Sequence, residues 1–477
     1  MAKLPKPKKL RTFGELKKSH YFSQTVKAEM RKNLIQKVRT GEELFPGIVG
    51  YDETVVPQFE NAILSGQDII FLGERGQAKT RMIRSLIHLL DEEIPVLAGC
   101  EIHDNPFHPI CKACLEKVKA MGDRVPIDWL RREQRYGEKL ATPDVTIADL
   151  IGEVDPIKVA EGRYLSDELT IHYGLIPRTN RGIFAINELP DLGEKIQVGL
   201  FNIMEERDVQ VRGYKIRLPL DVYIVASANP EDYTNRGRII TPLKDRYGSE
   251  IRTHYPRSPE DEIKIMESER TRFEDDGFKT TIPFYFKEII AEITALARKS
   301  PEINQRSGVS VRVSIANYEN IISNALRRAI RLHEREVVPR VSDLPYLAAS
   351  TSGKIEFESM DDDRGQNFFE KLIAKAVLNV FNRHFQVQQF DDLLTRFKTG
   401  WSVEVSEGMK SSAYQEKTRE HSLYSGEMKG LWEGLKKLGC DQSAATLASG
   451  LEFILEGLHL HHRLNKEPLP GKSTYRA

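Results

Sequence analysis

A short segment with two glycines and an alanine, between an apolar segment and a helix, constrains this chain more than any other feature. This short segment is Gly73-Glu-Arg-Gly76-Gln-Ala78-Lys79-Thr80, and the apolar segment Asp68–Leu72 comes directly before it. Residues 81–90 follow with apolar side chains at helical spacing. Small residues let backbone N–H groups close around phosphate oxygens at the start of a helix. The sequence therefore predicts a strand–loop–helix unit that binds nucleotide phosphates.

Within this loop, Lys79 is expected to reach the β- and γ-phosphates of ATP, and the Thr80 hydroxyl to ligate Mg²⁺. The usual pattern has glycine where this chain has Ala78, and an alanine penalises any positive φ angle. The whole loop and the next residue are candidate nucleotide contacts: Gly73, Glu74, Arg75, Gly76, Gln77, Ala78, Lys79, Thr80 and Arg81.

Two further apolar runs, Gly182–Ile186 and Asp221–Ala226, have the composition of buried parallel strands. Helical patterns lie between them, which predicts a doubly wound α/β domain. Beyond about Pro256, amphipathic helices dominate, and they continue from Gln366 to the end. We expect a basic arm and helix over 1–40, the α/β core over 41–255, a helical lid over 256–360 and a helical extension over 361–477.

Composition excludes several classes of protein. The chain has 477 residues, and its 70 Lys and Arg balance 70 Asp and Glu, so no global charge points to nucleic acid or a membrane surface. No stretch approaches the ~20 apolar residues of a membrane span, and no secretory signal is visible. Four cysteines do not make a disulfide scaffold. These features predict a cytoplasmic protein. The basic segment Met1–Lys18 is expected to be a solvated, disordered tail, and an arm that contacts an acidic partner is the alternative.

Several motifs, in order, resemble the AAA+ ATPases of the magnesium-chelatase I-subunit and MoxR families. The phosphate loop resembles the MoxR form G-x-x-G-x-A-K-T. Phe45–Glu53 (FPGIVGYDE) resembles the adenine-contacting segment of the I subunits, which makes Ile48 and Val49 candidate adenine contacts. Gly174–Glu188 (GLIPRTNRGIFAINE) resembles their stretch that ends in Asp-Glu. The resemblance extends from about Phe45 to Asn317 and implies an AAA+ fold.

The same resemblance assigns roles to individual residues. Glu188 is expected to polarise the attacking water, whereas Asn187 replaces the usual Asp and would hold Mg²⁺ only through water, without charge. Asn229 resembles sensor 1, and Arg312 resembles sensor 2. Arg246 resembles the arginine finger, which acts on the γ-phosphate of a neighbouring subunit.

Two other segments match elements of this AAA+ branch. Residues from Thr146 to Asp155 resemble the chelatase helix-2 insertion. Asp208–Leu218 alternates about a central Arg-Gly and predicts the hairpin that precedes sensor 1.

A compact group of cysteines and histidines is a candidate zinc site. Cys111 and Cys114 have knuckle spacing, and Cys100 with His103 or His108 would complete four ligands; we take Cys100, His108, Cys111 and Cys114 as the set. Thiols that simply stay reduced are the alternative.

The leading hypothesis is an enzyme: an Mg²⁺-dependent ATPase that works as a homo-oligomeric ring, most often of six subunits, and remodels a partner protein. The resemblance implies a partner with a von Willebrand factor A domain. The I subunits are shorter than this chain, so a related ATPase is favoured over the chelatase itself. Two alternatives stay open: a nucleotide-binding scaffold disabled by Asn187, and a DNA- or transcription-remodelling factor. No helix-turn-helix or aromatic-basic stripe supports the last.

Overall fold

The computed structural model describes residues 10–160, 168–205, 218–229, 237–274, 277–304, 308–357, 362–422, 428–469 and 471–477. Contacts between residues divide the chain into two compact units, Met1–His254 and Tyr255–Ala477. We call these the N-terminal unit and the C-terminal unit.

A five-stranded parallel sheet is the centre of the N-terminal unit. Its strand order is β4-β7-β8-β1-β9, so β1 lies between β8 and β9. The strands are β1 (Ile69–Leu72), β4 (Tyr136–Leu140), β7 (Gly182–Asn187), β8 (Val222–Ala228) and β9 (Ser249–Arg252). All residues of β1, β7 and β8 are buried, which confirms the three strands predicted from apolar runs.

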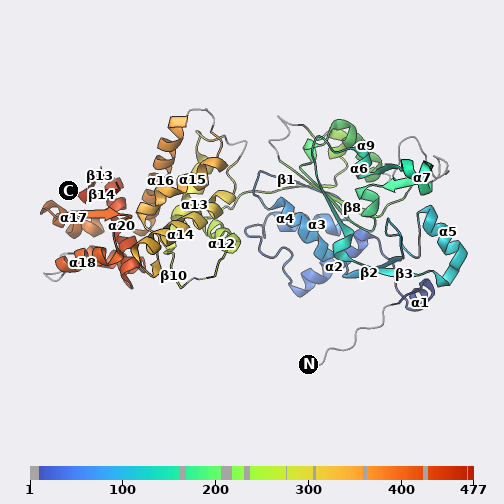
Figure 1. The fold of residues 1–477 in the computed structure, drawn as a ribbon, viewed down its shortest axis with the longest axis horizontal. Helices are drawn as coiled ribbons and strands as arrows, with labels where there is room; N and C mark the ends of the chain where they lie inside the picture. The colour runs from blue at the N-terminus through green and yellow to red at the C-terminus, as the bar shows by residue number, and fades with distance from the viewer. Residues whose placement is uncertain are drawn as a thin grey trace, which may run out of the picture. The chain divides into compact units, whose positions relative to one another are not determined.

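Alternate residues of these strands pack into two different apolar clusters. Ile69 and Phe71 belong to one cluster, and Ile70 and Leu72 belong to the other. Because successive strand residues point to opposite faces, each cluster covers one face of the sheet. Figure 1 shows α3 (Val55–Leu64) and α4 (Lys79–Ser85) beside one face and α9 (Glu194–Glu205) beside the other. The doubly wound α/β architecture is therefore confirmed.

One of the first helices has the end signals that are typical of helices, and another ends earlier than predicted. Helix α2 (Val26–Thr40) begins at Thr25, whose hydroxyl accepts a hydrogen bond from the Ala28 N–H, and it ends at Gly41 with φ 68°. A single helix was predicted over residues 81–90, but α4 stops at Ser85 and a 3₁₀ turn continues over Leu86–Leu89.

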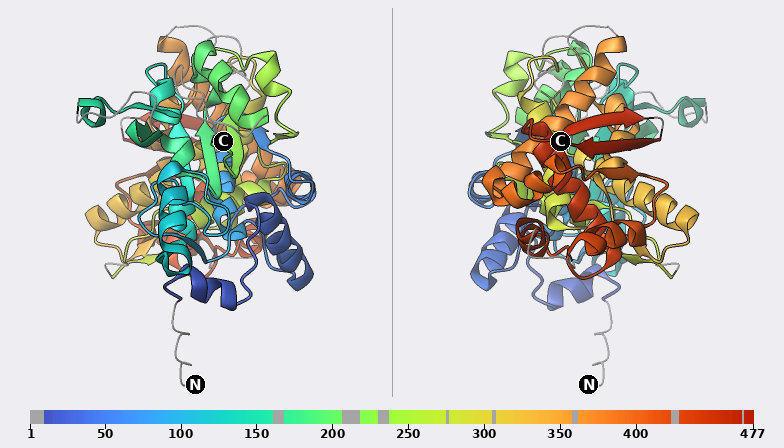
Figure 2. Two further views of the ribbon diagram at one scale, coloured as in Figure 1. Left: turned by 90° about the vertical axis from the view of Figure 1, so that its right-hand side faces the viewer. Right: turned by 90° about the vertical axis from the view of Figure 1, so that its left-hand side faces the viewer.

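The prediction of a solvated tail over Met1–Lys18 is wrong for the part that is described. Helix α1 (Phe13–Lys18) buries Phe13 and Leu16, which lie one turn apart on the same face. The Phe13 N–H donates to the Val125 carbonyl at 2.9 Å. The segment is held by these apolar contacts despite its many lysines, and Figure 2 shows it (dark blue) beside the segment between β2 and β3.

Smaller elements surround the core strands. β2 (Glu93–Leu97) pairs antiparallel with β3 (Ile127–Arg131), and α5 (Lys112–Met121) lies between them in sequence. The segment predicted as the helix-2 insertion, Thr146–Asp155, contains α6 (Ile147–Leu150) and β5 (Gly152–Val154). Further along the chain lie α7 (Pro156–Ala160), β6 (Ile171–Tyr173) and α8 (Leu175–Arg178), and β6 pairs antiparallel with β5. Of the hairpin predicted over Asp208–Leu218, residues 208–217 lie outside the described part of the chain. The short helix α11 (Thr241–Lys244) precedes β9.

The C-terminal unit is mainly helical, and the largest apolar cluster among its described residues draws members from Ile263 to Tyr475. A smaller cluster contains Ala325, Ala329 and Val337. Its helices are α12 (Pro259–Glu269), α13 (Phe284–Lys299), α14 (Arg312–Leu332), α15 (Ala348–Thr351), α16 (Asp362–His384), α17 (Asp391–Lys398), α18 (Ser411–Ser422), α19 (Lys429–Lys437) and α20 (Ala444–Leu460). Helices were predicted to the end of the chain, but β12 (Val403–Ser406), β13 (Asn465–Leu469) and β14 (Lys472–Arg476) form an antiparallel sheet. These strands are short and largely polar, so they carry no strong apolar pattern. β10 (Lys279–Thr280) pairs with β11 (Glu336–Val337).

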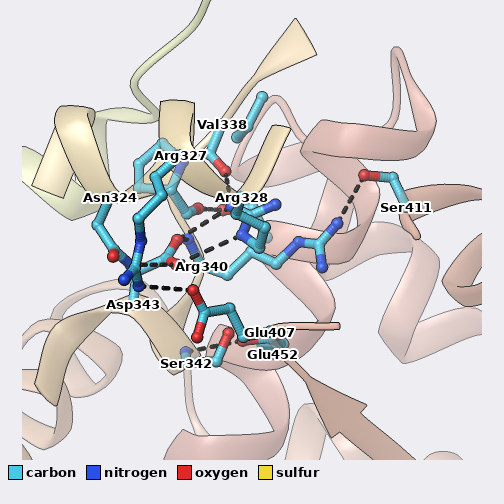
Figure 3. A network of polar contacts seen from close by, with 12 residues as sticks. Asn324, Arg327, Arg328, Val338, Arg340, Ser342, Asp343, Glu407, Ser411 and Glu452 are labelled. Atoms are coloured by element: carbon cyan, nitrogen blue, oxygen red, sulfur yellow. Dashed lines mark hydrogen bonds and ion pairs between the residues drawn. The ribbon is translucent and has the colours of Figure 1, made fainter. Parts of the chain in front are cut away.

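A buried polar network ties this unit together (Figure 3). The Asp343 carboxylate accepts hydrogen bonds from the Arg328 guanidinium at 3.0 Å and from the Arg340 N–H at 2.7 Å. Arg340 also donates to the Ser411 hydroxyl at 2.7 Å, and the Ser342 N–H donates to Glu452 at 2.9 Å. Residues before and after position 360 are therefore joined by buried hydrogen bonds as well as by a common core. Among the helices that the structure describes, none has the length and hydropathy needed to cross a bilayer.

Candidate nucleotide site

Three of the predicted motifs meet at one edge of the parallel sheet. The phosphate loop follows β1, Glu188 follows β7, and Asn229 follows β8. These strands are neighbours, and Leu72 pairs with Ala228 while Ile186 pairs with Ala226. Carboxyl ends of adjacent parallel strands lie together, and this edge is where open α/β sheets bind ligands. The topology thus brings together residues separated by over 150 positions in sequence.

The phosphate loop has the backbone shape that its small residues allow. Gly76 has φ 79° and Ala78 has φ 57°, so both lie in the left-handed region. Ala78 is strained there because its Cβ crowds the following carbonyl. Lys79 is buried, and its ammonium donates to the Gly73 carbonyl and to the Glu74 carbonyl at 2.9 Å. A buried ammonium beside a loop of backbone amides is the arrangement that an anionic phosphate chain requires.

Tight packing around the first glycine holds the loop against the sheet. A Cβ at Gly73 would lie 1.8 Å from the Thr253 hydroxyl and 2.3 Å from the Gln77 side-chain oxygen. These two side chains are themselves hydrogen-bonded, with Thr253 donating to Gln77 at 2.6 Å. The Tyr51 hydroxyl lies 3.0 Å from the Gln77 carbonyl, and burial raises the pKa of Tyr51 to about 12. Any side chain at position 73 would therefore disrupt the loop.

A cavity of about 400 Å³ opens beside the loop. Its described lining consists of loop residues together with two cations and Thr253: Leu72, Gly73, Glu74, Gln77, Lys244, Arg252 and Thr253. Lys244 and Arg252 come from the segment around the predicted arginine finger, but Arg246 itself is not among these lining residues.

Asn187 is held by partners at both ends of its amide. Its Nδ2 donates to the Glu138 carboxylate at 2.6 Å, and its Oδ1 accepts from the Ser227 hydroxyl at 3.2 Å. Glu138 lies on β4, the strand beside β7, and forms a two-point ion pair with Arg84 at 2.8 Å for both contacts. This hydrogen-bonded ion pair lowers the pKa of Glu138. A carboxylate is therefore present next to Asn187, although Asn187 has no charge of its own.

Glu188 begins a tight turn directly after β7. Its backbone has φ 53° and ψ 50°, an unusual conformation for a residue with a side chain. Its N–H donates to the Ser227 hydroxyl at 3.3 Å. Ser227 also donates to Asn187, so a chain of hydrogen bonds runs from Glu138 through Asn187 and Ser227 to Glu188. Asn229 is buried two residues beyond Ser227, at the end of β8.

Arg246 is bound within its own unit. Its guanidinium pairs with Glu205, donates to the Pro242 carbonyl at 2.6 Å, and lies 4.8 Å from the centre of the Phe201 ring. Its side chain is 25% exposed. The arginine is therefore positioned at the end of α9, and it is not among the described lining residues of the phosphate cavity.

The remaining predicted nucleotide contacts lie in two places. Ile48 lines a second cavity of about 250 Å³ together with Phe45 and Val56, whereas Val49 is not among the described residues of that lining. Arg312 is the first residue of α14 in the C-terminal unit, where its side chain is exposed. Arg75 lies within the loop and Arg81 directly follows it, and both have exposed side chains.

The cysteine segment gives a ligand set different from the predicted one. Ligand atoms of Cys100, Asp104, Cys111 and Cys114 all lie within 4.8 Å of one another. His108 does not join them: its side chain is exposed, and its N–H bonds back to the Asn105 carbonyl. The prediction of His108 as a ligand is therefore wrong in this structure, because the turn at Asn105–His108 directs that residue to the surface.

Sequence reasoning missed several residues of these sites. Tyr51 and Asp104 lie inside segments that were already recognised, and burial of a polar residue in a motif could have marked them. Thr253, Arg84 and Glu138 lie on separate elements with no motif, so only the three-dimensional arrangement reveals them.

The amino-acid sequence is similar to those of known magnesium-chelatase subunits. The chain is 26% identical over 322 residues to the magnesium-chelatase subunit ChlI of Nostoc sp., which covers 63% of this chain and 80% of that protein. It is 29% identical over 249 residues to the chloroplastic ChlI of Oryza sativa subsp. indica, which covers 49% of this chain and 54% of that protein. The chain is a relative of the magnesium-chelatase I subunits. No family model matches it.

Solved structures are similar to this chelatase relative at lower sequence identity than the two ChlI subunits. A magnesium-chelatase complex of BchI and BchD superposes with a TM-score of 0.35 at 19% identity, covering 67% of this chain and 98% of that one. An ATPase described as putative, from Cytophaga hutchinsonii, superposes with a TM-score of 0.30 at 16% identity, covering 76% of this chain and 98% of that one. The assignment to the AAA+ group rests on the sequence relatives and on the topology and loops of the sheet.

Proposed function

We propose that this chelatase relative is an AAA+ ATPase that hydrolyses ATP as a homo-oligomeric ring and remodels a partner protein. The observation that supports this most directly is the meeting of Lys79, Glu188 and Asn229 at one sheet edge. A phosphate-binding lysine alone would suit any nucleotide-binding protein. A carboxylate and a buried amide at the ends of the next two strands add the groups that activate and orient water.

In the proposed reaction, the loop amides and Lys79 bind the β- and γ-phosphates and stabilise the charge that develops on them. Glu188 accepts a proton from the attacking water, and Asn229 orients that water. Thr80 and Asn187 would hold Mg²⁺, which would neutralise phosphate charge when bound. The amide oxygen of Asn187, and not its amino group, points toward Ser227. An acceptor oxygen therefore lies on the side of Asn187 that faces β8.

The competing function, a nucleotide-binding scaffold without turnover, is favoured by one observation. The Glu138 carboxylate is fully engaged by Arg84, Asn187 and the Tyr136 hydroxyl, so it does not present a free oxygen to a metal. We still favour hydrolysis because Glu188 is retained in a defined conformation that the hydrogen-bond chain supports.

The proposal extends to the assembly and its surroundings. The ring would have six subunits, with Arg246 contributed by a neighbour, and its partner would carry a von Willebrand factor A domain. We place the protein in the cytoplasm. Its cofactors would be Mg²⁺ and a structural zinc ion in the cysteine segment, with ATP as substrate.

The test compares three full-length proteins: the natural chain, Glu188→Gln and Lys79→Ala. We expect Glu188→Gln to bind a fluorescent ATP analogue normally and to lose turnover by ~10²-fold or more. Lys79→Ala should lose binding itself. If the natural protein, shown by mass to be an assembled ring, binds ATP but turns over no faster than Glu188→Gln, the scaffold function is the correct one.

A further inference from the structure

Three thiols converge in the segment between β2 and β3. Cys100 follows β2, Cys111 precedes α5, and Cys114 lies in the first turn of that helix. All three are free thiols, and the sulfur atoms of Cys100 and Cys111 are 4.0 Å apart. A tetrahedral zinc ion with Zn–S bonds of about 2.3 Å requires sulfur atoms about 3.8 Å apart. The spacing is therefore that of zinc ligands and is too long for a disulfide.

Asp104 supplies the fourth ligand atom. Its Oδ2 accepts hydrogen bonds from the N–H groups of Ile110 and Cys111, both at 3.0 Å, and this fixes the carboxylate. Its Oδ1 is buried, and no residue that the structure describes donates a hydrogen bond to it. A buried, unpaired carboxylate oxygen is costly unless a cation satisfies it.

The other candidate ligands fit less well. His108 is exposed and lies outside the group of four. His103 has a buried Nδ1 without a partner, but its ring is also outside that group. Three sulfur atoms and one oxygen favour zinc over Mg²⁺ or Ca²⁺, which bind oxygen ligands.

We propose that Cys100, Cys111, Cys114 and Asp104 bind one structural zinc ion. This site does not depend on ATP hydrolysis, because its ligands all lie within fifteen residues and none belongs to the nucleotide site. The fixed loop in turn holds the N-terminal helix. Phe107, which lies between the ligands Asp104 and Cys111, packs against Phe13 of α1 with ring centres 5.3 Å apart. It also stacks on Tyr21 at 6.4 Å. Zinc at this site therefore anchors α1 through the loop.

The first test measures the metal content of full-length protein purified without a histidine tag. We expect one zinc ion per chain by elemental analysis. After exchange for Co²⁺, we expect the visible bands of a tetrahedral site with thiolate charge transfer. Zinc-free protein that is folded by circular dichroism would overturn the proposal. A Cys100–Cys111 disulfide found by mass spectrometry of protein purified under reducing conditions would also overturn it.

Matched variants then identify the fourth ligand. Asp104→Asn should weaken zinc binding by about tenfold or more, since loss of a ligand is at least as costly as loss of a group that only orients one. His108→Ala is the control and should keep one zinc ion with unchanged affinity. If His108→Ala loses the metal and Asp104→Asn keeps it, the proposed ligand set is wrong.

The role in anchoring α1 is tested on the natural protein, so it does not require a variant that folds. Removal of zinc with a chelator should increase hydrogen exchange at the amides of Phe13–Lys18, and added Zn²⁺ should reverse the increase. Exchange in the nucleotide loop should change much less. Unchanged exchange in α1 after complete zinc removal would show that the metal does not anchor this helix.

Discussion

The loops after β1 and β7 each depart from the common motif at one residue, and the structure accommodates the two departures differently. Ala78 occupies a position with φ 57° that favours glycine, and its neighbours cannot remove that backbone strain. Asn187 stands where an aspartate is usual, and Glu138 and Ser227 bind the two ends of its amide. The amide of Asn187 is thus fixed by partners on neighbouring strands, whereas the methyl group of Ala78 has no such compensation.

The two departures are accommodated differently because backbone strain and an unpaired buried amide have different consequences. A left-handed alanine costs about 1–2 kcal/mol, which a folded protein can absorb. A buried polar group without a partner costs about as much or more, and it also leaves the side chain without a fixed orientation. Strain can therefore remain at a site, but a buried amide in a catalytic position requires partners on other strands.

The largest expected effect concerns Arg246, which lies outside both loops. Its loss measures the part of the hydrolysis rate that neither loop contributes. Arg246→Ala should bind ATP and assemble normally but lose about 10³-fold in kcat, since an arginine finger contributes on that scale. Arg39→Ala, an exposed arginine on α2, is the control and should keep full activity.

Mixed rings give a sharper version of this test. Arg246→Ala and Glu188→Gln subunits are each inactive alone, but an interface that pairs an intact Glu188 with an intact Arg246 should hydrolyse ATP. No recovery in rings shown by mass to be mixed would remove Arg246 from the site and confine catalysis to the two loops.

The second prediction addresses the partner of Asn187 directly. Glu138→Ala should lower kcat by about 10- to 100-fold while ATP affinity changes little, because the amide of Asn187 loses the group that orients it. Steady-state kinetics and a binding titration separate the two quantities. Glu133→Ala removes an exposed carboxylate nearby and should have no effect.

An exchange of the carboxylate and the amide between β4 and β7 also tests whether Glu138 acts through Asn187. It keeps a hydrogen bond between the two side chains possible. The double variant Glu138→Gln/Asn187→Asp moves the carboxylate from β4 to β7. It should recover most of the activity and reach half-maximal rate at a several-fold lower Mg²⁺ concentration. A double variant no better than Glu138→Ala would mean that Glu138 does not act through Asn187.

The smallest expected effect concerns the strained loop. Ala78→Gly should stabilise the nucleotide-free protein by about 0.5–1 kcal/mol, since relief of strain exceeds the added entropy of the unfolded chain. Urea unfolding measures it. Ala28→Gly, at an exposed position of helix α2, should instead lose up to about 1 kcal/mol. A loss of stability in Ala78→Gly would show that the positive φ angle is not a source of strain.

The sequence predicted the central strands well because β1, β7 and β8 are buried on both faces and consist of uninterrupted apolar runs. It missed β4 and β9, the edge strands, because they carry charged residues such as Glu138 and Glu250. The motifs identified Lys79, Glu188 and Asn229 as candidate site residues, and the sheet topology places all three at one edge.

Other parts of the sites could not be predicted, because they depend on where the backbone directs a side chain. His108 and Asp104 are equally near the cysteines in sequence, and only the turn of the chain after Asn105 separates them. Glu138 approaches Asn187 through strand pairing, in which Leu140 rather than Glu138 is opposite Asn187. Buried ion pairs such as Arg135 with Glu29 likewise join residues that no local pattern connects.

The largest apolar cluster of the C-terminal unit has a consequence for folding during synthesis. Residues 1–254 contain both apolar clusters of the parallel sheet, so the N-terminal unit can fold while the rest of the chain is still being translated. The C-terminal unit cannot do the same in stages, because Ile263 and Tyr475 belong to one cluster. Its early helices therefore remain with exposed apolar faces until residue 475 leaves the ribosome, and that interval is when this chain is most open to chaperones and to aggregation.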